Sequence, residues 1–104
     1  MEIIFLDEAL EKFIYSLESQ TIAKVLRTIG LLEEFGNKLG MPHSKKVGAG
    51  LFELRIRGAQ EIRLFYTFQK NKAVLLIGFI KKSNKIPHRE IKRALNKLAS
   101  IDSI

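Results

Sequence analysis

The chain has 104 residues, 46% of them hydrophobic, with a formal net charge of +7 at pH 7 and no cysteine. We therefore expect a single domain over residues 1–104 that folds without disulfides. Zinc held by thiolates is excluded, and no carboxylates lie at a fitting spacing from the two histidines, so we expect neither a metal nor a cofactor. The longest apolar run, residues 73–80, is too short to span a membrane, which favours a cytoplasmic protein.

The positive charge is concentrated in the second part of the sequence. Residues 1–37 have a net charge of −4, whereas residues 38–72 and 81–97 each have a net charge of +6. Such asymmetry favours a surface that faces a polyanion such as nucleic acid. On charge alone, a lysine-rich surface kept for solubility is an equal alternative.

The first third of the chain predicts one strand and two helices. Residues 2–6 are β-branched and aromatic, as is typical of a strand. Asp7 then caps an amphipathic helix. Ser19 or Thr21 caps a second helix, which ends at Gly36. Because the connection between them is short, we expect these helices to form an antiparallel hairpin.

The remainder predicts a loop, three strands and a third helix. Residues 38–50 are rich in glycine and indicate a loop. The strands that follow are expected at residues 51–57, 62–68 and 73–80, the last of them buried on both faces. Pro87 suits the first turn of the final helix. The expected order is β-α-α-β-β-β-α, an α+β fold with a small and mainly antiparallel sheet.

The segment 51–66, "LFELRIRGAQEIRLFY", predicts a hairpin with a defined register. Apolar side chains face one another across it only if the turn has three residues, because side chains alternate between the faces of a sheet. This turn pairs Leu54 with Leu64. It also places Arg55 directly opposite Arg63.

Two like charges opposed on a sheet repel each other, so folding alone gives no reason for pairing Arg55 with Arg63. A phosphate group supplies a reason, because planar guanidinium groups bind its oxygens in a bidentate way. The alternative is that Glu53 and Glu61 flank the arginines closely enough to form a surface ion-pair network of little energetic value.

A second basic cluster lies in "KKSNKIPHRE". Lys81 and Lys82 come where the last strand ends, a position from which sheet proteins present ligand-binding groups. His88 lies in the first turn of the last helix, and its ordinary pKa of about 6.5 suits proton transfer near neutral pH. A lone histidine is more often a solvent-exposed or capping residue.

The ordered set of "LFELRI", "IRLFY" and an apolar strand ending in "FIKKSNKIP" resembles the RelE/ParE superfamily of type II toxins, in particular its HigB-like, phage-derived branch. The resemblance covers nearly the whole chain. It implies a fold like that of small microbial RNases, in which the concave face of the sheet binds messenger RNA, usually in the decoding site of the ribosome.

The resemblance also implies roles for individual residues. The positions that bind phosphate and stabilise the transition state are Arg55, Arg63, Lys81 and Lys82. The position of an acid or base in some relatives corresponds to His88. Further contacts with RNA are expected from Arg57, Lys45, Lys46, Lys85 and Arg89. Certain members have a lysine just before the "LR" pair, where this chain has Glu53.

We therefore expect the toxin of a toxin–antitoxin system, a metal-independent endoribonuclease that cuts messenger RNA on the ribosome and inhibits translation. The resemblance also implies a cognate antitoxin, often a helix-turn-helix protein. Two alternatives are a ParE-like toxin that poisons DNA gyrase and a non-catalytic module that binds RNA or the ribosome. The basic set that includes Arg63, Lys81 and Lys82 favours the nuclease.

Overall fold

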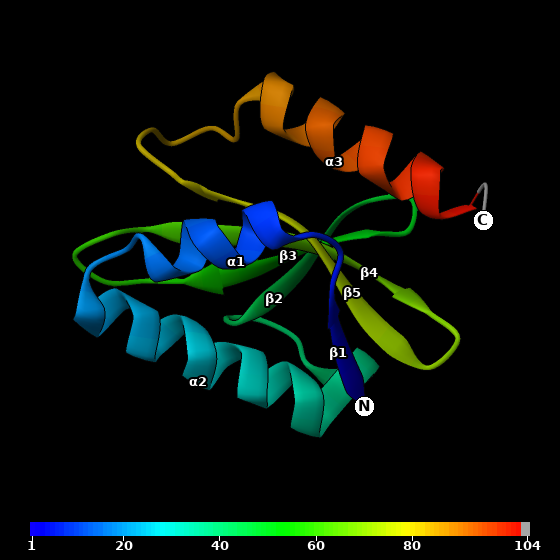
Figure 1. Ribbon diagram of the computed structural model, residues 1–104, viewed down its shortest axis with the longest axis horizontal. Coiled ribbons are helices and arrows are strands. Elements are labelled where there is room, and N and C mark those ends of the chain that lie inside the picture. Colours follow the sequence, from blue (N-terminus) through cyan, green and yellow to red (C-terminus); the bar gives the residue numbers. More distant parts are fainter. Residues whose placement is uncertain (103–104) are drawn as a thin grey trace.

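Five strands form one sheet in the order β1-β5-β4-β3-β2 (Figure 1). The computed structural model describes residues 1–102 of the chain. The strands are β1 (Glu2–Phe5), β2 (Ser44–Gly48), β3 (Leu51–Ile56), β4 (Ile62–Gln69) and β5 (Lys72–Ile80). Neighbouring strands are antiparallel except for β1, which pairs with β5 in parallel. The predicted α+β class with a mainly antiparallel sheet is therefore confirmed.

Helices cover both faces of this sheet (Figure 1). They are α1 (Glu8–Tyr15), α2 (Ser19–Phe35) and α3 (His88–Asp102), and a short 3-10 helix, η1 (Gly36–Lys38), follows α2. The first two helices lie on one face and α3 lies on the other. Among residues 1–102, no helix is long and apolar enough to cross a membrane.

Each face of the sheet has its own apolar core, because the side chains of the central strands alternate between faces. On the helical-hairpin side, Leu54 and Leu64 are fully buried beneath α1 and α2. On the α3 side, Phe65 and Phe79 pack with Ala94. β5 contributes buried side chains to both cores, so its predicted burial on both faces is confirmed.

The predicted helix boundaries are confirmed at two positions and wrong at a third. Asp7 caps α1 by accepting a hydrogen bond from the backbone N–H of Leu10, and Gly36 ends α2 with a φ of 56°. The cap of α2, however, is neither Ser19 nor Thr21. The last extended residue is Glu18, whose backbone amide donates to Gln60 in the β3–β4 turn, and the helix begins directly after it.

The prediction of an unbroken loop over residues 38–50 is wrong, because Ser44–Gly48 forms β2 at the edge of the sheet. The glycines and the proline of this segment predicted a loop, whereas the strand forms because β3 offers it a pairing partner. The hydroxyl of Ser44 forms a 2.5 Å hydrogen bond with the hydroxyl of Tyr66, which ties β2 to β4 across β3. Exposed lysines on this edge strand are a usual guard against pairing with another chain.

The register of the β3–β4 hairpin follows the sequence prediction. Leu54 pairs with Leu64, and Arg55 pairs with Arg63. The apolar members face the core below α1 and α2, and the arginines therefore project from the opposite face. This single register decides which basic side chains meet.

Asp7 also ties α1 to α3. Its Oδ1 accepts the cap hydrogen bond from Leu10, while its Oδ2 lies 2.6 Å from Nζ of Lys97. The hydrogen bond from Lys97 holds the pKa of Asp7 below its ordinary value, against the smaller opposing effect of desolvation, and the backbone cap adds to the lowering. A carboxylate with a depressed pKa stabilises the fold above its unfolded-state pKa, and this stability is lost as the pH falls through the folded-state value.

Asp7→Asn keeps the cap acceptor and removes the charge. We expect its free energy of unfolding to fall less with decreasing pH than that of the wild type. Urea titrations at a series of pH values would show this as a smaller loss of unfolding free energy below about pH 4. Asp7→Ala should in addition lose about 1 kcal/mol near neutral pH, because the cap is gone. Parallel pH curves for wild type and Asp7→Asn would contradict the assigned role.

Candidate nucleic-acid interface

Arg55 and Arg63 lie on the α3 side of the sheet with one carboxylate between them. Oε1 of Glu53 is 3.4 Å from Nε of Arg55 and 3.5 Å from Nε of Arg63. The side chains of Glu53 and Arg63 are only 5% and 1% exposed. The opposed cations are therefore held together by a shared, buried anion, which offsets the repulsion expected of the pair.

This buried cluster is incompletely hydrogen bonded. The contacts of Glu53 with the two arginines lack hydrogen-bond geometry, and Oε2 of Glu53 and both Nε atoms are buried without a hydrogen-bond partner among the described residues. Unsatisfied buried polar atoms are uncommon in folded proteins and call for an explanation beyond folding. Binding of an anionic ligand beside the cluster is one such explanation.

The remaining nitrogens of Arg63 are also engaged. Its Nη1 donates to the backbone carbonyl of Ile62 at 3.1 Å, and its Nη2 lies 3.8 Å from Oε1 of Glu61. Desolvation lowers the pKa of Arg63, and the charge of Glu53 opposes this effect. A guanidinium stays protonated in proteins, so Arg63 is a fixed positive charge in a surrounding of low polarity.

The sequence offered the alternative that Glu53 and Glu61 form a surface ion-pair network with the arginines, and this alternative is confirmed only in part. Glu53 does flank both arginines, yet it does so in a buried cluster and not at the surface. Glu61 is 37% exposed and contacts Arg63 only through its longer ion pair. The arginine pair is thus flanked by a buried acid, Glu53, and by a partly exposed acid, Glu61, which also accepts a hydrogen bond from the backbone N–H of Gly58.

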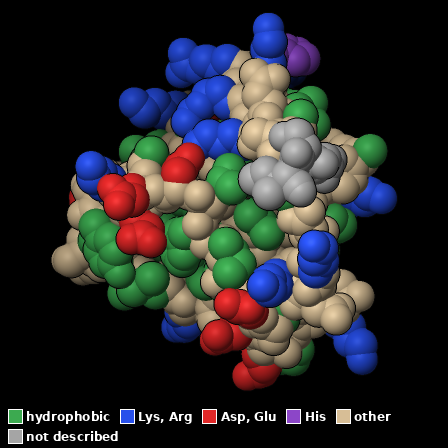
Figure 2. Space-filling model, turned by 45° about the vertical axis from the view of Figure 1, so that its right-hand side comes forward, with side chains coloured by type: hydrophobic (Ala, Val, Ile, Leu, Met, Phe, Trp, Pro, Cys, Tyr) green, Lys and Arg blue, Asp and Glu red, His purple; other side chains and the backbone are tan. Residues whose placement is uncertain are grey.

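Two adjoining clefts collect most of the predicted site residues. The first, of about 350 Å³, is lined by Arg57, Arg63, Lys81 and Lys82, together with Glu61, Ser83 and Asn84. The second, of about 300 Å³, includes Lys45, Arg55 and Lys85, with Glu53 in its wall. Lys81 and Asn84 border both clefts, so the clefts form one continuous basic surface. Figure 2 shows Lys and Arg side chains crowded at the end of the molecule where α3 begins.

Three predicted residues lie outside these clefts. Lys46 pairs with Phe52, whose ring packs on the helical-hairpin core, so Lys46 lies on the opposite face from Arg55. His88 and Arg89 are exposed in the first turn of α3 and line neither cleft. The structure therefore separates them from the arginine pair, although the second cleft extends to Ile86, two residues before His88.

Sequence reasoning missed the central place of Glu53 and the contribution of Asn84. The alternation of β3 already put Glu53 on the face of Arg55, but the sequence did not show that β2 would pair beside it, with Lys45 opposite Glu53. Asn84 belongs to an irregular connection whose course has no local pattern. Within the described chain, no three His, Asp or Glu side chains gather into a possible metal site.

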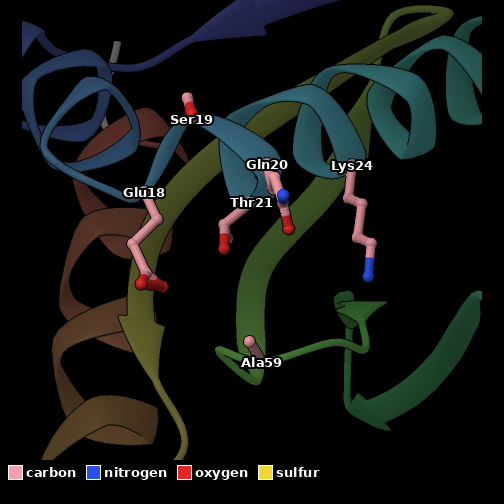
Figure 3. A pocket seen from close by; sticks show the side chains of 6 residues that line it. All are labelled: Glu18, Ser19, Gln20, Thr21, Lys24 and Ala59. Atoms are coloured by element: carbon pink, nitrogen blue, oxygen red, sulfur yellow. The ribbon is translucent and has the colours of Figure 1, made fainter.

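A further cleft lies between the first turn of α2 and the β3–β4 turn (Figure 3). It is lined by Glu18, Ser19, Gln20, Thr21, Lys24 and Ala59. None of the residues predicted to bind phosphate borders it. The side chain of Lys24 extends from α2 toward the β3–β4 turn in this view.

The strand order, the helices on both faces and the basic face of the sheet define a small α+β protein of RelE-like fold. The chain belongs to the family described as Phage derived protein Gp49-like (DUF891), which matches residues 12–99. This family is known as one of RelE/HigB-like toxins, and membership agrees with the toxin of a toxin–antitoxin system. No curated protein matches the chain. The predicted superfamily is thus confirmed at the level of this family, and the HigB-like branch stays a prediction.

Glu53→Gln should destabilise the fold strongly, because it removes the anion shared by the two opposed guanidinium groups, one of them almost fully buried. Breaking a buried ion pair in this way typically costs about 3 kcal/mol or more, measurable as the free energy of unfolding in urea. Glu61→Gln is the matched control, since its exposed ion pair with Arg63 is worth less than about 1 kcal/mol. Equal losses in the two variants would show that Glu53 does not hold the arginine pair.

Proposed function

We propose that this protein is the HigB-like toxin of a type II toxin–antitoxin system and that it cleaves messenger RNA on the ribosome. The observation that carries the proposal is the gathering of guanidinium and ammonium groups from β2, β3, β4 and the connection after β5 around two adjoining clefts. Family membership supports a toxin, and the chemistry of the clefts suits a phosphodiester. An antitoxin, of helix-turn-helix type, belongs to the same proposal.

RNA supplies its own nucleophile in the proposed reaction. A base takes the proton of a 2′-hydroxyl, the 2′-oxygen forms a bond to the adjacent phosphorus, and the bond from phosphorus to the 5′-oxygen breaks. An acid gives a proton to the departing 5′-oxygen, so the products are a 2′,3′-cyclic phosphate and a 5′-hydroxyl. Negative charge grows on the phosphoryl oxygens, where fixed cations stabilise the transition state more than the ground state.

The cations differ in how they can act on such a phosphate. Lys81 borders both clefts and is partly exposed, so its ammonium can contact a phosphoryl oxygen held between them. Arg63 is nearly inaccessible, and its charge acts over a short distance through a weakly polar surrounding. An entering phosphate would replace the exposed Glu61 as the partner of Arg63 Nη2.

We assign proton transfer to His88 and the positioning of Arg55 and Arg63 to Glu53. His88 follows the second cleft by two residues along the chain, and imidazole accepts and donates protons near neutral pH. Glu53 Oε2 has no hydrogen-bond partner among residues 1–102 and lies in the cleft wall, which makes this carboxylate the second candidate for the base.

We expect Lys81→Met to lower the rate of message cleavage by about a hundredfold to a thousandfold, the usual effect of losing one well-placed donor. The assay is primer extension on a defined messenger RNA in a purified translation system, with and without ribosomes. Lys38→Met is the control, since Lys38 is exposed and borders neither cleft. Both substitutions remove one charge and keep an aliphatic chain.

New RNA ends that lie within codons, require ribosomes and fade in Lys81→Met would support the proposal. An intact message with unaffected translation would contradict it. Inhibition of gyrase supercoiling in that case would establish the ParE-like alternative, and ribosome binding without cleavage would establish the non-catalytic module.

For His88→Ala we expect a loss of at least about a hundredfold in cleavage rate, together with a changed pH dependence of that rate. The measurement is the single-turnover rate over a range of pH, with circular dichroism to check folding. His88 is exposed, so its removal should leave the fold intact. A normal pH profile in His88→Ala, with a folded but inactive Glu53→Gln, would transfer the role of base to Glu53.

A further inference from the structure

The basic surface continues past β3 onto α2. Besides the two clefts of the proposed cleavage site, a third basic cleft of about 310 Å³ includes Lys24 and Arg27 from α2, Arg55 from β3, and Arg57 directly after β3. Arg55 also borders the second cleft and Arg57 the first, so all three clefts are connected through these two arginines. No carboxylate lines the third cleft, which we call the α2 groove.

Three of the four lysines and arginines that line the α2 groove have no ion-pair partner among the described residues. Lys24, Arg27 and Arg57 form no ion pair with any carboxylate in the described part of the chain. Arg55 and Arg63, in contrast, share Glu53. A group of neighbouring cations without a counter-charge is unfavourable for folding, so it indicates a polyanionic ligand.

The absence of a side chain at Gly58 leaves room for the end of the Lys24 side chain over the β3–β4 turn. A Cβ atom at this position would lie only 2.6 Å from Nζ of Lys24. Gly58 does not have a positive φ, so its backbone does not itself require glycine. Figure 3 shows the Lys24 side chain directed from α2 toward this turn. The ammonium is thereby placed beside Arg57, which follows the end of β3.

We infer that the α2 groove binds the sugar–phosphate backbone of the RNA strand outside the cleaved phosphate, with Lys24 and Arg27 contacting successive phosphates. The inference rests on the proposed function, because the groove extends the same RNA path through Arg55 and Arg57. An acidic protein segment could also contact these cations. Continuity with both clefts of the proposed cleavage site favours RNA.

The test measures binding of a short RNA oligonucleotide whose 2′-hydroxyls are all methylated, so that it cannot be cleaved. For the double variant Lys24→Gln/Arg27→Gln we expect weaker binding and a slope of log affinity against log salt concentration that is shallower by about 1.4, or about 0.7 per lost phosphate contact. The control is Lys12→Gln/Lys38→Gln, which removes the same charge from exposed lysines outside all three clefts. Its slope should stay close to that of the wild type.

Gly58→Ala separates the placement of the Lys24 ammonium from its charge. The added methyl group should displace Nζ while the net charge is unchanged, and we expect a slope that is shallower by about 0.7. In a background that already carries Lys24→Gln, the same change should have no effect. An equal effect in both backgrounds would mean that Gly58 acts through the turn and not through Lys24.

Three outcomes would overturn the inference. Equal weakening by Lys24→Gln/Arg27→Gln and by the control pair would leave only a general charge effect, and message cleavage by the variants would show that the proposed function still holds. Unchanged RNA binding with lost affinity for the antitoxin would assign the groove to protein. Absence of RNA binding by the wild type, with no cleavage on ribosomes, would remove both the groove and the proposed function.

Discussion

The carboxylate of Glu53 is the constraint on which the β3–β4 pairing depends. Apolar side chains on the face covered by α1 and α2 fix the register of β3 and β4. This register places Arg55 opposite Arg63. A shift by one residue would relieve the repulsion only by turning the apolar face outward. The chain instead places an acid on the same face of β3, within ion-pair distance of both arginines. Glu53 thus allows β3 and β4 to keep the register that buries their apolar side chains while they present arginines on the other face.

The two faces of the sheet divide these tasks between them. The face below α1 and α2 has a continuous apolar core that includes Leu54, Leu64 and Leu75, and it supplies hydrophobic stabilisation without buried charge. The face toward α3 has a smaller core, and its outer part holds the buried cluster of Glu53 and the arginines. Buried ion pairs of this kind add little net stability. The apolar core beneath α1 and α2 therefore supplies the stability that offsets the cost of burying the charges.

Local patterns explain which features were predictable from the sequence. The alternation in β3 and β4 determined the register, and the Asp7 cap and the double burial of β5 followed from residues adjacent in the chain. Features that depend on distant partners were not predictable. β2 exists because β3 offers it an edge, the side on which Lys46 lies follows from that pairing, and the separation of His88 from the arginine pair follows from an irregular connection. The alternation of the strands therefore predicted the opposed arginines, but not the position of His88 or of Lys46 relative to them.

The net charge of each sequence segment does not show which segments contribute to the basic surface. Residues 1–37 are acidic overall, yet Lys24 and Arg27 within them line a cleft together with the arginines of β3. Because Arg55 and Arg57 each border two clefts, changing either one alters two regions at once. Cations that belong to a single cleft, such as Lys82 or Arg27, are the ones that can distinguish binding along an RNA strand from stabilisation of the reacting phosphate. The connectivity of the surface thus determines which substitutions are informative about mechanism.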